Sequence, residues 1–347
     1  MFFGSIPALV TPFSANCVDE DSLRGLIEWQ IDEGSNGLVP CGTTGEAATL
    51  TTDEHRRVIR IAVEVARGRV PVIAGCGSNN TAHAVELTRM AKELGADAAL
   101  HVPPYYNRPN QDGIYAHLSA VADEGIPVIL YNVPSRTITD ISVETMTRLA
   151  RLPHVVGVKD ATGNLARVSA QRLACGEQFV QLSGNDDMAL GFNAMGGKGC
   201  ISVSANVAPG LCAQFQEAMR EGRWDEALEL QDRLYPLHAA LFSDASPGPV
   251  KYALSRVRNG FPVELRAPMT EPSAASKRRS TKRWRMRGWP KPPPCREGPV
   301  SPKRPPCRKS AQPRSTKPRS SPRTGARASI ISSRNGWRLE SSYRARK

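Results

Sequence analysis

The sequence lacks the features of a membrane protein, of a secreted protein and of a metal-binding protein. No run approaches the roughly 18 apolar residues that span a bilayer. The apolar start, Met1–Phe13, has no basic n-region and contains Pro7 and Pro12, so it does not resemble a signal peptide. The eight cysteines form no CxxC pair, and the six histidines show no ligand-like spacing. We therefore expect reduced thiols, a cytoplasmic protein, no metal and no membrane partner.

Acidic residues are scarce in only one part of the chain, so the net charge of +13 describes neither part. After Ser276, 23 Lys and Arg stand against two Glu, which leaves the tail at +21 and the preceding body at −8. The tail also holds 11 Pro and no apolar periodicity. Such a composition cannot form a core, so we predict that residues 277–347 are a disordered basic tail.

Eight short apolar runs, bounded by Gly, Pro, Asn or Asp, recur through the body. They are Ile6–Val10, Gly37–Cys41, Val70–Gly75, Asp97–Val102, Ile126–Tyr131, Val155–Val158, Phe179–Leu182 and Gly199–Val203. Helix-like stretches lie between most of them, for example Asp53–Arg67, Thr81–Leu94 and Val143–Leu152. Alternating helices and uniformly apolar strands indicate a parallel sheet buried on both faces. We predict an α/β fold, a (β/α)8 TIM barrel, over residues 1–206.

The pattern changes after Asn206 to consecutive helices with no further strand. These helices are predicted at Pro209–Glu221, Trp224–Phe242 and Pro249–Arg258. We expect residues 207–276 to form a C-terminal helical extension packed on the barrel.

Polar motifs close the apolar runs, where a barrel of this kind builds its active site. They are GTTGE at 42–46, PYYN at 104–107, YNVPSRT at 131–137, KDATG at 159–163, SGND at 183–186 and GGKGCISVSAN at 196–206. Lys159 is the most informative residue, because VVGVKDAT places an amine at the end of a buried strand. Burial disfavours the charged form, and only the neutral amine attacks a carbonyl. The alternative is a structural ion pair with Asp160 or Glu46.

Three other features suit an imine on Lys159, although each has an ordinary structural explanation. The phenol of Tyr131 could carry protons, or its ring could simply pack in the core. The GTTGE loop offers hydroxyls and backbone N–H groups to a carboxylate, but glycine-rich turns are common. Arg136 could bind a carboxylate in two places or remain a solvated loop charge. Together they indicate a small keto acid held as an imine and a second anionic substrate bound by Arg136.

The motifs resemble those of the dihydrodipicolinate synthase family, within the N-acetylneuraminate lyase superfamily of class I aldolases. The resemblance runs from about Met1 to Thr270, and it includes GSIPALVTPF, GTTGE, the double Tyr, YNVPSRT, GVKDATGNL, LSGND and GCISVSANV. It implies condensation of pyruvate with aspartate 4-semialdehyde, the entry step to diaminopimelate and lysine. It also implies a homotetramer and no cofactor beyond the covalent imine.

The resemblance assigns roles to single residues. Lys159 would form the imine, while Thr43, Tyr131 and, from a neighbouring subunit, Tyr106 would relay protons. Thr44 and backbone groups at Gly184 and Ile201 would hold pyruvate, and Arg136 would take the semialdehyde carboxylate. Sister aldolases act on sugar acids and often carry GSTGE, so Thr44 and the SRT sequence favour the synthase. Ile138, where family members often have Gly, is a departure that could alter the second-substrate pocket.

The regulatory site departs further. Many members bind the end product lysine at a dimer cleft, and the corresponding positions here are Ala47, Thr52, His55, Asn79, His83 and Tyr105. His83 stands where the family has a carboxylate, so we predict weak or absent lysine inhibition.

The basic tail has two explanations. Its Lys, Arg and tryptophans could bind nucleic acid through phosphates and stacking, which we consider the weaker hypothesis. The other is a shifted reading frame. Permitted GC-rich codons for Lys277–Met286, read from the third base, encode Ala-Ala-Ile-Asp-Glu-Ala-Met-Ala-Met, a plausible form of the amphipathic helix that ends family members.

Overall fold

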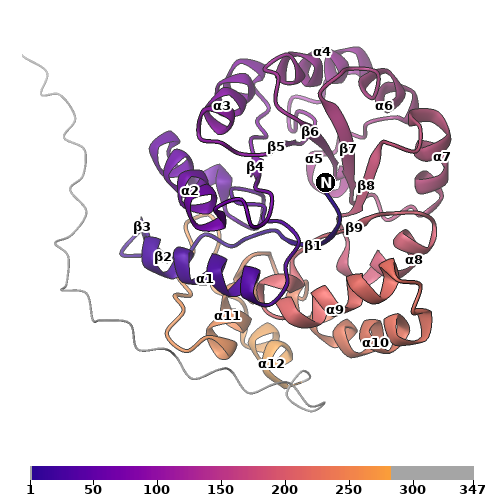
Figure 1. Cartoon of the computed structure of the whole chain (residues 1–347). Helices are drawn as coiled ribbons and strands as arrows, with labels where there is room; N and C mark the ends of the chain where they lie inside the picture. Colours follow the sequence, from indigo (N-terminus) through magenta and orange to yellow (C-terminus); the bar gives the residue numbers. More distant parts are fainter. Residues whose placement is uncertain (1, 283–347) are drawn as a thin grey trace, which may run out of the picture. The chain divides into compact units, whose positions relative to one another are not determined.

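The computed structural model describes residues 2–282, and its centre is a parallel sheet curled into a ring (Figure 1). Seven strands follow the order β1-β9-β8-β7-β6-β5-β4. Their bounds are β1 Gly4–Pro7, β4 Ile73–Gly75, β5 Ala98–His101, β6 Val128–Asn132, β7 Val155–Asp160, β8 Val180–Ser183 and β9 Gly199–Ser202. Each pair of neighbours is parallel, and β1 pairs with β9, so the first and last strands of the ring lie side by side.

The eighth predicted run, Gly37–Cys41, closes the ring without forming a regular strand. Val39 bridges Ala8 on one side, and Leu38 bridges Val72 on the other. Backbone hydrogen bonds from Leu38 N to Pro71 O and from Val39 N to Pro7 O support these bridges at 2.9 Å each. Prolines at 7, 40 and 71 remove N–H donors that a longer ladder would need. The predicted (β/α)8 barrel is confirmed.

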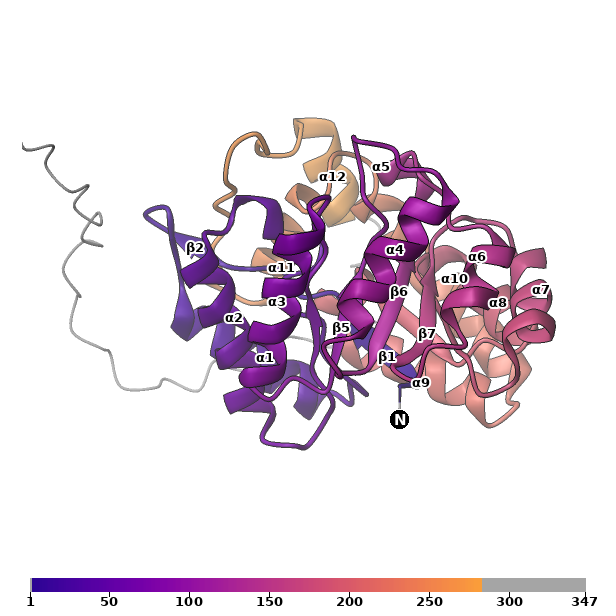
Figure 2. The same cartoon turned by 90° about the horizontal axis from the view of Figure 1, so that it is seen from above.

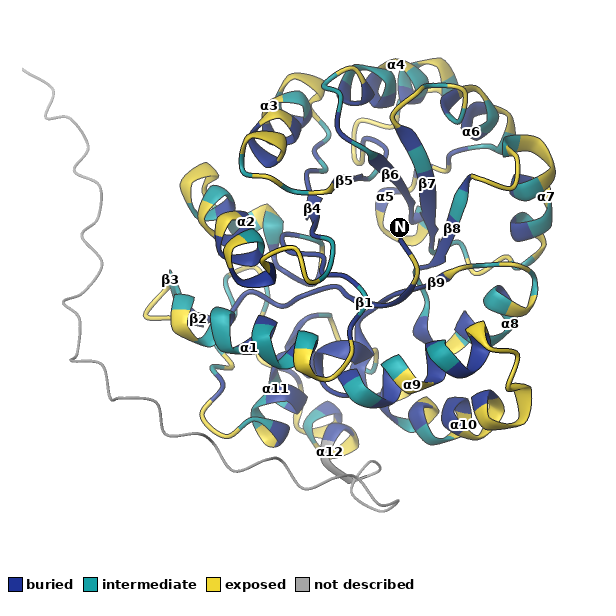
Figure 3. Ribbon diagram, viewed as in Figure 1, coloured by how far each residue is buried: buried dark blue, intermediate teal, exposed yellow. Residues whose placement is uncertain are grey.

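Helices cover the outside of the ring and turn their buried residues toward it (Figures 2 and 3). They are α1 Glu20–Asp32, α2 Thr52–Ala66, α3 Thr81–Glu93, α4 Gln111–Ala122, α6 Val143–Leu149, α7 Ala166–Cys175, α8 Ala189–Ala194 and α9 Pro209–Arg220. Polar caps begin several of them: the Asn80 side chain accepts from Ala82 N, and Thr51 and Glu54 form a reciprocal capping box on α2. These caps fix where the loops at the strand ends give way to helix.

Three helices follow this ring: α10 Trp224–Leu241, α11 Gly248–Val257 and α12 Ala274–Lys282. They pack on one another, and α9, which was expected in the extension, packs against both α10 and β1. The predicted domain division stays a prediction. Shorter elements complete the described part: the hairpin β2 Phe13–Ser14 and β3 Cys17–Val18, the single turn α5 Pro134–Thr137, and the 3-10 turns η1 Ala47–Thr49, η2 Asp186–Met188 and η3 Ser204–Asn206. No helix within residues 2–282 is both long and apolar enough to cross a membrane.

The predicted start of the disordered tail at Lys277 needs correction. Residues 277–282 belong to α12, where Ser276 is buried and its hydroxyl lies 2.8 Å from that of Ser243. The rest of the predicted tail, 283–347, including its tryptophans, lies outside the described residues. A helix forms here despite low apolar content because α12 packs on α10 and α11.

Candidate active site

Lys159 lies at the carboxyl end of β7, directly beside Tyr131 on β6. The two residues are register partners, and the Lys159 ammonium nitrogen stands 4.1 Å from the centroid of the Tyr131 ring. Lys159 is 5% exposed and Tyr131 is 8% exposed. The negative face of the ring attracts the ammonium and holds the flexible lysine side chain against the strand next to it. The structure therefore joins the two residues that the motifs predicted to act together.

Neither structural ion pair considered for Lys159 forms. The Asp160 carboxylate accepts from Thr162 N (2.9 Å), Arg167 Nε (3.2 Å) and Gln171 Nε2 (2.8 Å). Successive strand side chains point to opposite faces, so Asp160 faces away from Lys159. Within residues 2–282, no carboxylate forms an ion pair with Lys159.

The second carboxylate, Glu46, is held by a residue far away in the sequence. Lys251 Nζ donates to Glu46 Oε1 at 2.6 Å, and the Arg266 backbone N–H donates to Glu46 Oε2 at 3.1 Å. The sequence motifs did not predict this pair. Its signal was a lone lysine in the apolar run of α11, between the buried Val250 and Leu254, where a charge needs a partner.

The GTTGE segment is a tight turn at the mouth of the barrel. Gly45 N donates to Gly42 O at 3.0 Å, and the Thr11 hydroxyl donates to Gly45 O at 2.7 Å. Thr44 is buried, whereas Thr43 is exposed. A Cβ on Gly75 would lie 2.1 Å from Cys41 O, so only glycine lets β4 approach the start of the turn this closely. The turn and Lys159 follow parallel strands and therefore share the same end of the barrel.

Gly184 and Ile201 border Lys159 on the β8–β9 side. A Cβ on Gly184 would stand 3.2 Å from Lys159 Cε and 2.7 Å from Ala161 Cβ, so a side chain there would crowd the lysine stem. The Gly184 N–H already donates to Asp160 O at 2.7 Å, which leaves its carbonyl to a ligand. Ile201 is fully buried opposite Ile6.

A buried carboxylate fixes the strand end next to Ile201. Asp186, in the SGND motif, accepts from the Ser202 hydroxyl, from Val203 N at 2.9 Å and from Ser204 N at 3.3 Å. This carboxylate therefore sets the backbone path where the resemblance places a pyruvate contact.

Arg136 and Tyr106 stand on exposed loops and do not contact Lys159 within this chain. Arg136 belongs to the short turn α5, and Ile138 directly after that turn has a φ of 60° and is 63% exposed. The Thr139 hydroxyl donates to Pro104 O at 3.0 Å and ties this loop to the one carrying Tyr106. Tyr106 has a φ of 72° and is 91% exposed.

The expected regulatory residues lie on η1, on α2, on α3 and in the loops that follow β4 and β5. Thr52 and His83 line a groove of about 280 Å³ between α2 and α3, together with Arg56, Glu86, Leu87, Arg89, Met90 and Glu93. His55 instead is buried, with Nε2 2.8 Å from Gly75 O, and burial lowers its pKa to about 4. Asn79 Nδ2 donates to Tyr105 O at 3.2 Å, and Ala47 begins η1. The groove does contain carboxylates, but Glu86 and Glu93 face His83 at 3.4 Å and Arg56 at 4.0 Å.

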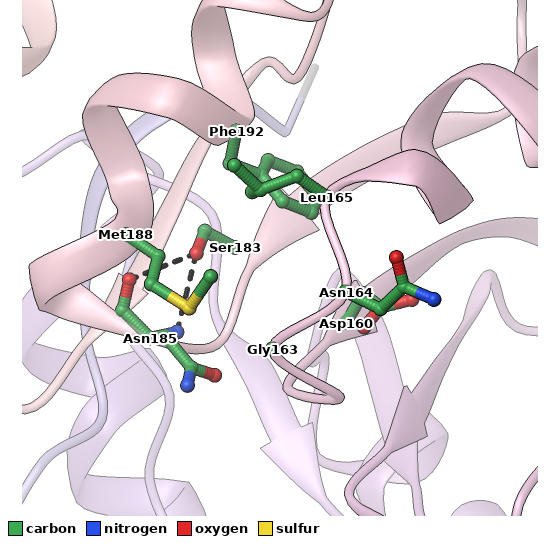
Figure 4. A pocket seen from close by; sticks show the side chains of 8 residues that line it. All are labelled: Asp160, Gly163, Asn164, Leu165, Ser183, Asn185, Met188 and Phe192. Atoms are coloured by element: carbon green, nitrogen blue, oxygen red, sulfur yellow. Dashed lines mark hydrogen bonds between the residues drawn. The ribbon is translucent and has the colours of Figure 1, made fainter.

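A small pocket of about 10 Å³ lies behind the site, at the ends of β7 and β8 (Figure 4). It is lined by Asp160, Gly163, Asn164, Leu165, Ser183, Asn185, Met188 and Phe192. The Ser183 hydroxyl donates to Asn185 O at 2.9 Å and accepts from Asn185 N at 3.2 Å. This space has room for about one water molecule and lies on the face opposite Lys159. No group of three or more His, Cys, Asp or Glu in the described part of the chain is placed to hold a metal.

Comparisons with known proteins agree on one family. The model of the "Dihydrodipicolinate synthetase family" matches residues 1–284. The 4-hydroxy-tetrahydrodipicolinate synthase of Rhizorhabdus wittichii is 64% identical over 278 residues, which cover 80% of this chain and 96% of that protein. The Zymomonas mobilis protein of the same name is 61% identical with the same coverage.

Solved structures show the same relationship. Dihydrodipicolinate synthase from Aquifex aeolicus superposes with a TM-score of 0.79 at 45% identity, covering 80% of this chain and 96% of that one. The chloride-inhibited dihydrodipicolinate synthase from Acinetobacter baumannii, complexed with pyruvate, gives 0.79 at 42% identity, covering 82% of this chain and 100% of that one.

Proposed function

Because the chain belongs to the dihydrodipicolinate synthetase family, we propose that it is a lyase that condenses pyruvate with aspartate 4-semialdehyde. The product is 4-hydroxy-tetrahydrodipicolinate, the entry compound of diaminopimelate and lysine biosynthesis. The observation that carries this proposal is Lys159, a buried amine beside the Tyr131 ring with no carboxylate partner in residues 2–282. Such an amine is free to add to a carbonyl.

The chemistry proceeds through covalent intermediates on Lys159 and needs no cofactor. The Lys159 amine adds to the keto carbon of pyruvate, and loss of water leaves an iminium. This cation accepts the electron pair when the pyruvate methyl group loses a proton, which gives an enamine. The enamine carbon then attacks the aldehyde of the second substrate and forms the new carbon–carbon bond, while the aldehyde oxygen takes up a proton and the iminium forms again. The amino group of the second substrate then displaces the Lys159 nitrogen from the iminium carbon, which closes the ring of the product and frees the lysine.

The surrounding groups take the roles that the motifs suggest. Tyr131 is adjacent to the reacting nitrogen and would relay protons through Thr43 and through Tyr106 of a neighbouring subunit. Thr44 and backbone groups at Gly184 and Ile201 would hold pyruvate. Arg136, on its exposed loop, would bind the carboxylate of the semialdehyde through its forked guanidinium.

A homotetramer fits the Tyr106 side chain, which is 91% exposed on a loop with a left-handed backbone. An exposed aromatic residue held in that conformation suits a contact with a second subunit. We place the enzyme in the cytoplasm, in keeping with six free cysteines in the described residues. Sedimentation analysis of the full chain tests the assembly, and a monomer with full activity would contradict the role of Tyr106.

Borohydride reduction in the presence of pyruvate tests the imine. We expect one reduced pyruvate attached to Lys159, located by peptide mass spectrometry. Lys159→Ala should abolish the adduct, whereas Lys198→Ala, at an exposed lysine, should leave it unchanged. An adduct on another lysine would refute the assignment.

The second substrate needs its own test, because sister aldolases share the imine. We expect kcat/KM with aspartate 4-semialdehyde to exceed the value for condensation of pyruvate with any sugar-derived aldehyde. Higher activity with the sugar-derived substrate would favour the sister-aldolase function.

A further inference from the structure

The most unusual interaction outside the Schiff-base site is a buried ion pair that joins the GTTGE turn to α11. Glu46 and Lys251 are 205 positions apart, their charged atoms are 2.6 Å apart, and their side chains are 2% and 0% exposed. Removing two charges from water is costly, and a pair of apolar side chains often stabilises a fold equally well. A pair retained at this depth therefore suggests a requirement for a fixed geometry.

Both charged groups have further partners, and all of these lie in the hairpin region or the C-terminal extension. Lys251 Nζ also donates to Glu264 O at 2.8 Å and stands 4.2 Å from the centroid of the Phe13 ring. The Arg266 guanidinium stands 4.2 Å from the same centroid. Arg266 N also donates to the second Glu46 oxygen, so two residues of the extension, Lys251 and Arg266, hold the carboxylate.

The backbone of Glu46 also makes hydrogen bonds that form the turn. Its N–H donates to Thr43 O at 3.1 Å, and its carbonyl accepts from Thr49 N at 3.0 Å. Its φ is 54°, a left-handed conformation that a residue with a Cβ adopts only when its surroundings impose it. The side-chain contacts with Lys251 and Arg266 supply that constraint. Without them, the turn can relax to an ordinary backbone conformation and carry Thr43 and Thr44 with it.

We propose that Glu46 and Lys251 are positioning residues, which hold the GTTGE turn so that Thr43 and Thr44 meet pyruvate bound at Lys159. The inference rests on the proposed function. It makes α11 and the segment reaching Arg266 part of the apparatus that binds pyruvate, although neither touches the substrate. Lys159 stands on β7 and does not depend on the pair, so its amine keeps its place when the pair is lost.

Three variants separate positioning from folding. Lys251→Met keeps the length of the side chain and removes its charge, but it leaves Glu46 buried and unpaired. Glu46→Gln removes the other charge. The double variant contains no stranded charge and should recover much of the stability that Lys251→Met loses. Arg24→Met is the matched control, because it breaks an equally short ion pair, with Glu64 at 2.7 Å, between exposed side chains of α1 and α2.

The measurements are the pyruvate dependence of borohydride trapping, KM for each substrate, kcat, and the thermal midpoint. In the double variant we expect the midpoint to recover while KM for pyruvate stays raised by about 10-fold to 100-fold, the effect of a small misplacement of binding groups. Trapping should still reach completion at high pyruvate. Arg24→Met should match the wild type.

The inference is overturned if the folded double variant binds pyruvate like the wild type, or if the two substrates are affected equally. Should Lys251→Met fail to fold, the double variant decides the matter. Failure of the proposed function would look different, because the wild type itself would then form no pyruvate adduct on Lys159.

Discussion

The surroundings of Lys159 and Lys251 make an instructive pair. Both lysines are buried, and each ammonium lies over an aromatic ring, Tyr131 at 4.1 Å and Phe13 at 4.2 Å. Lys251 also has a carboxylate at 2.6 Å, whereas Lys159 has none in the described residues. The carboxylate fixes the position of the Lys251 side chain, so Lys251 is a structural anchor. Lys159 is not engaged by a carboxylate in the described residues, so its nitrogen is available to a substrate.

The largest expected effect is on activity. Lys159→Ala should lower kcat by at least about 10³-fold, because loss of a covalent nucleophile removes the whole reaction path. Lys251→Ala should still form the pyruvate adduct. Steady-state rates and borohydride trapping measure both. If Lys251 proved to be the trapped residue, the two lysines would have to exchange roles.

The next effect is on stability, and here substitution of Lys251 has a larger effect than substitution of Lys159. Lys251→Met should lower the free energy of unfolding by about 3–5 kcal/mol, because it strands the Glu46 carboxylate in the interior. Lys159→Met leaves no carboxylate behind and should change that free energy by less than about 1 kcal/mol. Urea titrations of the two variants give the comparison directly. Equal losses would mean that pairing does not distinguish the two sites.

His101 is another buried base without a carboxylate partner in the described residues, and its protonation should affect the pH dependence of stability. Burial lowers the pKa of His101 from 6.5 to about 3, and its Nε2 lies 3.0 Å from the Thr88 hydroxyl. The unfolded chain binds a proton below pH 6.5 while the folded one does not, so stability is full above pH 6.5 and falls as the pH drops toward 3. The loss should reach about 2 kcal/mol at pH 5.

His101→Gln is the variant that checks this dependence. It removes the titrating ring, so its urea-unfolding free energy should decline less between pH 7 and pH 5 than that of the wild type. His83→Gln, at an exposed position, is the control. Parallel slopes for His101→Gln and the wild type would exclude His101 as a source.

A smaller effect concerns two left-handed residues at the barrel mouth. Glu46 is held in its conformation by side-chain contacts, but Ile138, with a φ of 60°, is 63% exposed. Ile138→Gly should therefore raise the free energy of unfolding by about 1 kcal/mol, because glycine adopts this conformation without strain. Chemical denaturation measures the gain. A loss of stability would show that the isoleucine side chain makes a favourable contact.

The smallest expected effect is that of lysine. Glu86 and Glu93 in the α2–α3 groove face His83 and Arg56, and His55 is buried against Gly75, so little free negative charge remains for a lysine ammonium. We expect weak or absent inhibition in steady-state assays. A low-micromolar inhibition constant would contradict this prediction.

Much of the fold followed from local patterns. Strands and helices alternate at short range in the sequence, and seven of the eight predicted runs overlap named strands of the observed sheet. The eighth, Gly37–Cys41, has the composition of a strand, but it makes only single bridges in a stretch of the ring rich in proline. The hydrophobic pattern of a segment predicts that the segment is buried. Whether it forms a regular strand depends on the backbone N–H groups that it and the neighbouring segments can donate.

The sequence by itself determined the barrel, the family and the place of Lys159 at the end of a buried strand. It left open whether Lys159 is a nucleophile or half of an ion pair with Asp160 or Glu46. Only the tertiary structure decided that both carboxylates bind elsewhere, Asp160 with Arg167 and Glu46 with Lys251. The reason is physical: side-chain pairing acts over a few ångströms in space, and the residues that the fold brings within that range, such as 46 and 251, share no local pattern in the chain.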